Sequence, residues 1–369
     1  MANTILTVNE IAKEAVMRLN NNLVMAGLVH TDFADEFSNK GDTVTIRKPA
    51  TFTANDFTDS ISVQGINESS VDVKLDTISD VSVEVTSKEM SLNIADFGTQ
   101  VLDGAMLALA EKIDYKLTSL YQDIPYYNGT AGTTPNALSN IAQVGKVLNA
   151  NKCPTAMRRM VMDEEAQASL VVLDAIANAE KSGSTDALRN ANMGRILGFD
   201  TFMDQNIRSH TKGTLAASSG TLAIASASAG ATSVTIAATA CSGTLKKGDI
   251  ITIADVEGQY VVTADKTAAS NSITVDIYPA LKSAVSAKAV TIVGSHVASL
   301  GFHKNAFALV TRPMALPMGG ADGYIATFNG LPVRVTMGYS MTSKVNTISF
   351  DILYGTKTLT PELAARMIG

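Results

Sequence analysis

The amino-acid composition changes abruptly at about Gly213, and this change constrains the fold more than any other feature of the sequence. From there to about Ser295 the chain contains neither methionine nor arginine, although 15 methionines occur in all. Alanine, serine, threonine, valine, isoleucine and glycine dominate this segment instead. Methionine-containing sequence resumes afterwards. We therefore expect residues 213–295 to be a domain inserted into a second domain, the host, whose two parts precede and follow it in the sequence.

The inserted segment has the pattern of an all-β domain. Short runs of alternating apolar and polar residues are separated by turn residues at spacings of roughly ten residues, which is typical of a β-barrel or sandwich. The runs are residues 233–236, 249–253, 259–263, 272–277 and 289–293. We therefore predict an inserted all-β barrel.

The first part of the host combines helices with paired strands. Residues 7–28 predict an amphipathic helix, because Ile11, Ala15 and Leu19 recur at helical spacing and Thr7 stands three residues before Glu10, as in a capping box. Residues 42–50 and 71–85 alternate as half-buried antiparallel strands, and the polar stretch between them predicts a long hairpin with a projecting tip. Residues 92–122 keep one apolar stripe and predict a long, rod-like helix.

The rest of the host continues in the same mixed style, so its class is α+β. We predict a helix from Pro135 to about Asn149, a strand over residues 159–162 and a helix that begins at Asp163. After the insert we predict strands over residues 306–311, 331–336 and 346–353. Residues 361–367 predict a short turn or helix.

The composition excludes several classes of protein. An apolar fraction of 46% offsets chain entropy, so the chain is expected to fold. A net charge of -6 and the absence of tryptophan argue against a dedicated nucleic-acid binder. Cys153 and Cys241 make neither a disulfide framework nor a zinc set. We find no apolar run of the ~18 residues that a membrane helix needs and no signal-peptide pattern, so we expect a cytoplasm-like setting and no membrane.

No constellation of catalytic residues stands out. The sequence has no Gly-x-Ser-x-Gly elbow and no phosphate-binding Walker loop. We expect the four histidines, His30, His210, His296 and His303, to be structural. The carboxylates at residues 163–165 are explained by the helix dipole, and the arginines at residues 158–159 are expected to be solvated or interface residues. We therefore predict no enzyme, no cofactor and no metal.

Seven short stretches of the host are distinctive, and they occur in order along the chain, from near the N-terminus to the last residues. The stretches are residues 22–29 (NLVMAGLV), 41–49 (GDTVTIRKP), 101–106 (VLDGAM), 178–185 (NAEKSGST), 198–200 (GFD), 302–308 (FHKNAFA) and 359–366 (LTPELAAR). Together they resemble the major capsid (coat) proteins of tailed bacteriophages, specifically the Salmonella phage P-22 coat type.

The resemblance implies the Hong Kong 97 phage capsid fold with an inserted β-barrel. It divides the chain into an N-terminal arm (1–40), an extended loop hairpin (41–90), a peripheral domain with a spine helix (91–156), two axial-domain parts (157–212 and 296–355), the barrel (213–295) and a C-terminal segment (356–369). The insert is the part least similar to the family, so no contact residue is carried over to it.

The implied function is that of a major capsid protein of a tailed double-stranded DNA phage. Such a protein self-assembles as hexamers and pentamers into an icosahedral procapsid and capsid shell, and encloses DNA without sequence-specific binding. The implied partners are further copies of the chain, a scaffolding protein and a portal protein, with a decoration protein as an optional further partner. The implied location is the virion, after assembly in the cytoplasm of the bacterial host.

Two groups of residues are candidates for contacts in such an assembly. In the family the arm engages a basic region of a scaffolding protein, and the acidic residues of this arm are Glu10, Glu14, Asp32, Asp35 and Glu36; a solvated helix face is the alternative explanation. The candidate residues of the intersubunit loop are Arg47, Lys48, Phe52, Phe57 and Asp59.

Two other classes of function stay open. An encapsulin-like cellular compartment shares the fold but holds cargo enzymes, and the β insert and the coat-like stretches count against it. An enzyme or a surface adhesin is the third class. The lack of a catalytic constellation and of a secretion signal weakens it.

Overall fold

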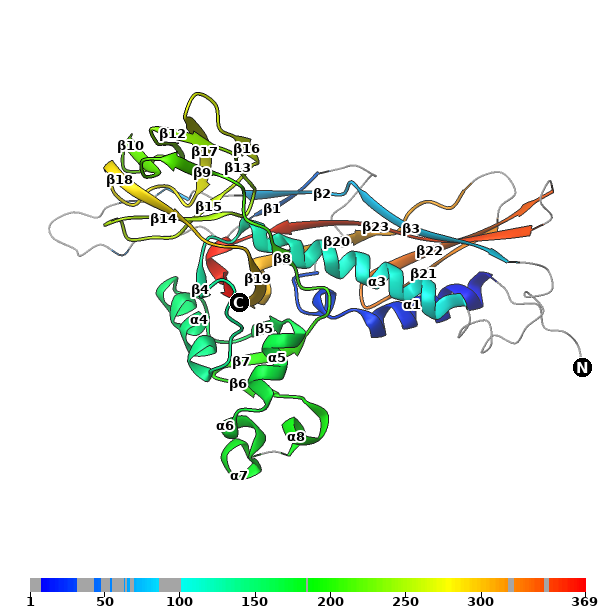
Figure 1. Cartoon of the computed structure of the whole chain (residues 1–369). Helices are drawn as coiled ribbons and strands as arrows, with labels where there is room; N and C mark the ends of the chain where they lie inside the picture. The colour runs from blue at the N-terminus through cyan, green and yellow to red at the C-terminus, as the bar shows by residue number, and fades with distance from the viewer. Residues whose placement is uncertain are drawn as a thin grey trace, which may run out of the picture. The chain divides into compact units, whose positions relative to one another are not determined.

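The computed structural model describes residues 8–31, 43–47, 54, 63, 65–66, 70–85, 101–183, 185–317, 322–341 and 345–369. The helices and strands are labelled in Figure 1. The chain forms two compact units. Unit 1 combines Met1–Leu23, Thr31–Lys112 and Ala308–Leu359, and unit 2 combines Val24–His30, Ile113–Phe307 and Thr360–Gly369. The predicted second axial part, residues 296–355, is divided between them at Phe307, and the predicted domain boundaries stay a prediction.

Unit 1 is built on an antiparallel sheet with a helix against it. Strands β20 (Phe307–Arg312), β23 (Val345–Thr358), β22 (Leu331–Ser340) and β21 (Asp322–Phe328) follow one another in that order, and β3 (Thr77–Val85) pairs with β23. Helix α1 (Val8–Asn22) packs on β21 and β22. It buries Ile11, Ala12, Ala15, Val16 and Leu19, which confirms the amphipathic helix predicted there.

The predicted hairpin is confirmed at its base and corrected beyond it. β1 (Thr43–Arg47) pairs antiparallel with β2 (Ser70–Lys74), as expected. The single strand predicted over residues 71–85 is wrong, because the chain leaves the ladder at residues 75–76 and β3 pairs with β23 instead. Leu75 is buried at this break, and β23 offers Ile348 and Phe350 as apolar partners. Most of the predicted hairpin tip lies outside the described residues.

Unit 2 contains a mixed sheet whose order is β4 (Tyr127–Gly129), β24 (Ala364–Ile368), β19 (His296–His303), β5 (Arg158–Met162), β7 (Phe199–Met203) and β6 (Arg195–Ile196). The short strand β8 (Ser209–His210) also pairs with β19. Helix α4 (Leu138–Ala150) lies against this sheet so closely that a Cβ atom at Gly301 of β19 would approach Val144 to 2.6 Å. That approach requires glycine.

Two expectations about helices need correction. The helix predicted over residues 92–122 is α3 (Asp103–Thr118), followed by the 3-10 turn η4 (Ser119–Asp123), and residues 92–100 lie outside the described part. The turn or helix predicted over residues 361–367 is wrong beyond η6 (Pro361–Leu363), because Ala364–Ile368 form a fully buried central strand. Arg366 interrupts the apolar run of this strand, so the strand cannot be recognised from the pattern of hydrophobic residues.

The remaining helices of unit 2 are short. They are η1 (Met25–Gly27), α5 (Glu164–Val171), α6 (Asp174–Ala177), α7 (Ala179–Ser182), α8 (Asp186–Asn190) and η5 (Lys304–Ala306). The predicted start at Asp163 is confirmed, because the carboxylate of Asp163 accepts a hydrogen bond from the backbone N–H of Ala166.

The inserted barrel is confirmed. Six strands close in the order β10 (Ala223–Ala227), β11 (Ser233–Ala237), β17 (Ser272–Tyr278), β15 (Tyr260–Val262), β14 (Ile250–Ile253) and β18 (Val285–Ile292). Two small pairs, β9 (Ala216–Ser219) with β12 (Ala240–Ser242) and β13 (Thr244–Leu245) with β16 (Lys266–Thr267), complete it. Inward-facing residues such as Ile236, Tyr260 and Val275 form its core. Strand β10 escaped prediction because alanine and serine give a weak strand signal.

Candidate functional site

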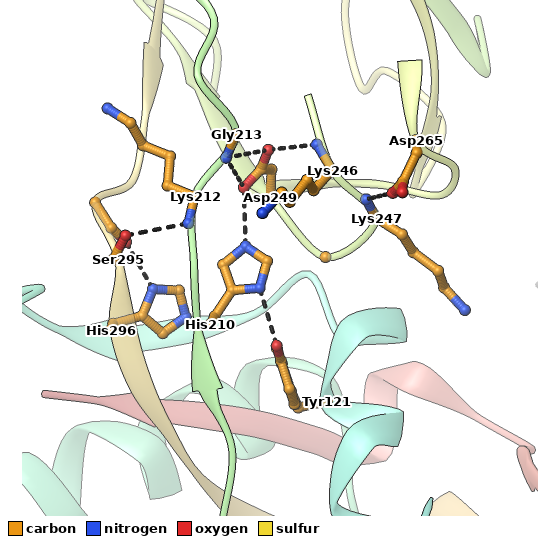
Figure 2. A network of polar contacts seen from close by, with 12 residues as sticks. Tyr121, His210, Lys212, Gly213, Lys246, Lys247, Asp249, Asp265, Ser295 and His296 are labelled. Carbon is orange, nitrogen blue, oxygen red and sulfur yellow. Dashed lines mark hydrogen bonds and ion pairs between the residues drawn. The ribbon is translucent and has the colours of Figure 1, made fainter. Parts of the chain in front are cut away.

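A buried polar network lies where the inserted barrel joins its host (Figure 2). His210, at the end of β8, lies between two partners. Its Nδ1 is 2.9 Å from the hydroxyl of Tyr121 in η4, and its Nε2 is 2.8 Å from Oδ1 of Asp249 in the barrel. All three residues are buried, so the two parts of unit 2 share one continuous hydrogen-bonded chain.

Asp249 is the centre of this network. It is 0% exposed and accepts hydrogen bonds from the backbone N–H groups of Gly213 and Lys246, at 3.1 and 2.7 Å, besides the contact with His210. A Cβ atom at Gly213 would lie 2.2 Å from the carbonyl oxygen of Thr244, so only glycine fits there. One carboxylate thus holds the chain entering the barrel, a turn inside the barrel and a side chain of the host.

The chain leaving the barrel is held beside the same site. The backbone N–H of Lys212 donates to the hydroxyl of Ser295, and Nδ1 of His296 lies 2.8 Å from the carbonyl oxygen of Gly294. The rings of His296 and His210 are 5.2 Å apart. Burial lowers the pKa of His296 to about 4, so the imidazole is neutral near pH 7 and its Nδ1 donates to the carbonyl oxygen.

Arg366 brings a charge to the network from β24. Its side chain is fully buried, and its Nη1 donates to the carbonyl oxygen of Gly248 at 2.9 Å. Its guanidinium lies 5.0 Å from the centroid of the Tyr121 ring, a cation–π arrangement. Burial lowers the pKa of Arg366 to about 9.

The network is suited to holding structure and not to bond chemistry. Burial raises the pKa of the Tyr121 phenol, so its hydroxyl stays protonated. The Asp249 carboxylate is occupied by backbone donors, and a polar pocket of about 580 Å³ beside Tyr121 and His210 has both lysine and aspartate on its wall. Among the described residues, no group of three or more His, Cys, Asp or Glu side chains could hold a metal ion.

A second polar contact fastens the N-terminal segment that belongs to unit 2. Asp114 of α3 is buried and accepts hydrogen bonds from the backbone N–H groups of Val24 and Met25, at 2.9 and 3.2 Å. It caps the turn η1 from 90 residues away. Burial raises the pKa of Asp114 to about 7, and the nearby Asp204 adds to the effect.

The structure describes three of the ten candidate contact residues that the sequence suggested. Glu10 and Glu14 lie on α1, where Glu14 pairs with Arg18 at 2.9 Å and Arg18 also pairs with Asp103 of α3. Arg47 ends strand β1. The other candidates, Asp32, Asp35, Glu36, Lys48, Phe52, Phe57 and Asp59, lie outside the described residues.

The junction could not be found from the sequence, and the expectation for Arg158 is wrong, whereas that for Arg159 stays a prediction. His210 lies 39 residues from Asp249 and 89 from Tyr121, and no local spacing links them. Arg158 and Arg159 were expected to be solvated or interface residues. Arg158 is instead buried and donates to carbonyl oxygens of residues 153 and 154. Arg159 donates to the carbonyl oxygen of Leu28.

Exposed apolar side chains are distributed unevenly over the described residues. None of the large hydrophobic residues at positions 213–295, all of which the structure describes, is exposed. Outside the barrel, Val172, Leu188 and Leu197 are exposed in unit 2, and Tyr339 and Met341 in unit 1; Leu188 is 72% exposed and Met341 82%. The surface of the barrel therefore suits water, whereas parts of its host present apolar surface to be covered.

Neither a protein-family model nor a curated protein matches the sequence. In the described part of the chain, no helix is both long enough and apolar enough to cross a membrane.

Solved structures match almost the whole chain. A chain of Mycobacterium phage Che8 matches with a TM-score of 0.53 and 16% identity, over 94% of this chain and 90% of that chain. The capsid structure of the cyanophage P-SCSP1u matches with a TM-score of 0.51 and 10% identity, over 92% of this chain and 86% of that chain. At such identities the likeness shows the fold, which is the Hong Kong 97 capsid fold expected from the sequence. The narrower P-22 coat type stays a prediction.

Proposed function

We propose that this chain is the major capsid protein of a tailed double-stranded DNA phage. Copies of it assemble as hexamers and pentamers into the icosahedral shell of the virion. The observation that carries the proposal is the shared fold with the cyanophage capsid subunit over 92% of this chain and 86% of that one. The closed barrel between residues 213 and 295 is a second support, because the resemblance of the host to phage coat proteins also implies an inserted β-barrel.

The distribution of apolar surface supports self-assembly. Permanent interfaces bury over ~2,000 Å² and resemble a protein core cut in half. The exposed residues Val172, Leu188 and Leu197 offer such surface on unit 2, and Tyr339 and Met341 offer it on unit 1. A charged fraction of only 17% also fits a subunit that is largely covered by its neighbours.

The remaining partners belong to the same proposal. A basic segment of a scaffolding protein would bind the acidic arm, whose Glu10 and Glu14 lie on α1; Glu14 also pairs with Arg18. A portal protein would occupy one vertex, and a decoration protein could bind the outside. A net charge of -6 suits a wall that encloses DNA without adhering to it. Assembly would take place in the cytoplasm of the bacterial host.

The test is electron microscopy of the full chain expressed with and without its neighbouring genes. We expect closed shells of uniform size when a scaffolding gene is present, and open or irregular shells without it. A chain that stays monomeric under both conditions would refute the proposal. Uniform shells formed by the chain alone, with a cellular enzyme inside, would instead favour the encapsulin-like compartment.

A further inference from the structure

The sheet of unit 2 has two edge strands, β6 and β4, which differ in how they are protected from pairing with another chain. At one edge lies β6, a strand of only two residues whose Arg195 is exposed, and short charged edge strands resist pairing with other chains. At the other edge lies β4, a strand of three residues whose one partner among the described strands is β24. Without a cover, an edge of this kind would present free N–H and C=O groups to any strand that approaches.

The backbone groups at the free side of β4 can be identified. The parallel pairing places Tyr127 opposite Arg366, and the N–H of Arg366 donates to the carbonyl oxygen of Tyr126. Backbone groups of successive residues in a strand point to opposite edges. The N–H and C=O of Tyr127 therefore point away from β24, where a further strand would pair with them.

A side chain of the barrel binds both of these groups. Gln259, which directly precedes β15, accepts a hydrogen bond from the N–H of Tyr127 at 2.8 Å through Oε1. Its Nε2 donates to the carbonyl oxygen of Tyr127 at 3.1 Å. This pair of hydrogen bonds is the pair that a residue of a neighbouring strand would form.

Two further contacts hold the barrel beside this edge. The hydroxyl of Tyr278, at the end of β17, donates to the carboxylate of Glu362 in η6, directly before β24. Arg366 of β24 donates to the carbonyl oxygen of Gly248 in the barrel. The barrel is thus anchored to β4, to β24 and to the turn that precedes β24, all at the same side of the sheet.

We propose that the inserted barrel caps the β4 edge of this sheet, with the Gln259 amide in the place of a neighbouring strand. In this position it prevents a second copy of the chain from adding a strand there. This role does not depend on the proposed function. It gives the insert a task within the single subunit, before any contact with other subunits.

The test compares the full chain with Gln259→Met, which keeps the length of the side chain but removes both hydrogen-bonding groups. We expect the Tyr127 amide, followed by hydrogen exchange with mass spectrometry, to exchange at least tenfold faster in the variant. We also expect dilute subunits to form irregular aggregates several-fold faster by light scattering. Electron microscopy distinguishes such aggregates from closed shells, so the result is separable from the outcome for the proposed function.

Two control variants separate the cap from simple docking of the barrel. Tyr278→Phe removes the contact with Glu362 but leaves the Gln259 amide in place, and Lys288→Met breaks an exposed ion pair with Asp255 elsewhere on the barrel. Both should leave Tyr127 exchange and aggregation within twofold of the unaltered chain. Protection of the β17 amides confirms in each variant that the barrel is folded.

Three results would overturn the proposal. The first is unchanged exchange at Tyr127 in Gln259→Met. The second is fast exchange without faster aggregation, which would show that the edge needs no cap. The third is aggregation of Tyr278→Phe as fast as that of Gln259→Met, which would show that the docking of the barrel, and not the Gln259 amide, prevents aggregation. If Gln259→Met lacks β17 protection, Gln259→Asn, whose amide is one methylene shorter, replaces it under the same criteria.

Discussion

At the scale of single residues, the carboxylates of three aspartates organise this subunit, and two of them, Asp249 and Asp114, are buried. Asp249 joins the barrel to its host, Asp114 holds the turn η1, and Asp163 begins α5. Only Asp163 could be predicted from the sequence, because a helix cap acts on residues within the next turn. Asp249 and Asp114 bind groups 39 and 90 residues away, and no spacing in the sequence reveals such partners.

Replacing Asp249 should destabilise the subunit strongly. Asp249→Ala leaves the buried N–H groups of Gly213 and Lys246 and the His210 ring without their acceptor, which we expect to cost about 3 kcal/mol of unfolding free energy. Urea denaturation followed by circular dichroism measures the loss. Asp255→Ala, which removes an exposed carboxylate of the same barrel, should leave the midpoint unchanged. Equal midpoints for the two variants would refute the role of Asp249.

Asp114 should make stability depend on pH near neutrality. Burial raises its pKa from 3.8 to about 7, so the folded state favours the protonated carboxyl. This contribution is fully present below about pH 4 and is lost as the pH rises through about 7. Relative to Asp114→Asn, which is neutral throughout, the unaltered chain should lose about 2 kcal/mol of unfolding free energy between pH 5 and pH 8. A difference between the two chains that does not change with pH would contradict this.

At the scale of secondary-structure elements, the sequence predicted what each segment forms better than what it pairs with. Alternation over residues 71–85 correctly indicated strand, and alternation over residues 213–295 indicated the barrel. The change of partner after Lys74 depends on β23, some 270 residues further along, and is not encoded in the alternation of β3. Strand β24 was not predicted because Arg366 is charged. The Arg366 side chain is nevertheless buried, where it contacts the Tyr121 ring and the carbonyl oxygen of Gly248.

A glycine marks the place where β2 and β23 approach each other. A Cβ atom at Gly355 would lie 2.3 Å from the carbonyl oxygen of Lys74, which is backbone and has little room to move. We expect Gly355→Ala to cost about 2 kcal/mol of unfolding free energy. Gly338→Ala on the neighbouring strand β22 meets no atom within 4 Å and is the matched control. Thermal unfolding of both variants measures the difference in stability. A Gly355→Ala subunit as stable as the control would show that the two strands can move apart at little cost.

At the scale of the whole molecule, the contrast seen first in the composition has a physical counterpart on the surface. The methionine-free and arginine-free segment folds as a barrel that exposes no large hydrophobic residue, whereas its host exposes several. The sequence could indicate the insert and its class from composition and period alone. It could not indicate which host residues stay exposed, since exposure depends on packing between distant segments.

This contrast predicts different tolerance to surface charge. Leu188→Asp places a charge on exposed apolar surface of the host, where a neighbouring subunit would have to bury it, and should reduce shell yield at least tenfold while the subunit stays folded. Ser226→Asp on the exposed face of β10 should leave the yield within twofold. Sedimentation of assembled particles measures both yields. Equal yields would remove Leu188 from the proposed contacts between subunits.

The most direct test of the central claim is a cryo-electron microscopy reconstruction of the particles that the full chain forms with its scaffolding protein. The account predicts a closed icosahedral shell of sixfold and fivefold clusters, with Leu188 and Leu197 covered by neighbouring copies and the barrel surface largely free. A shell with Leu188 and Leu197 facing solvent, or the absence of any closed particle, would contradict the account.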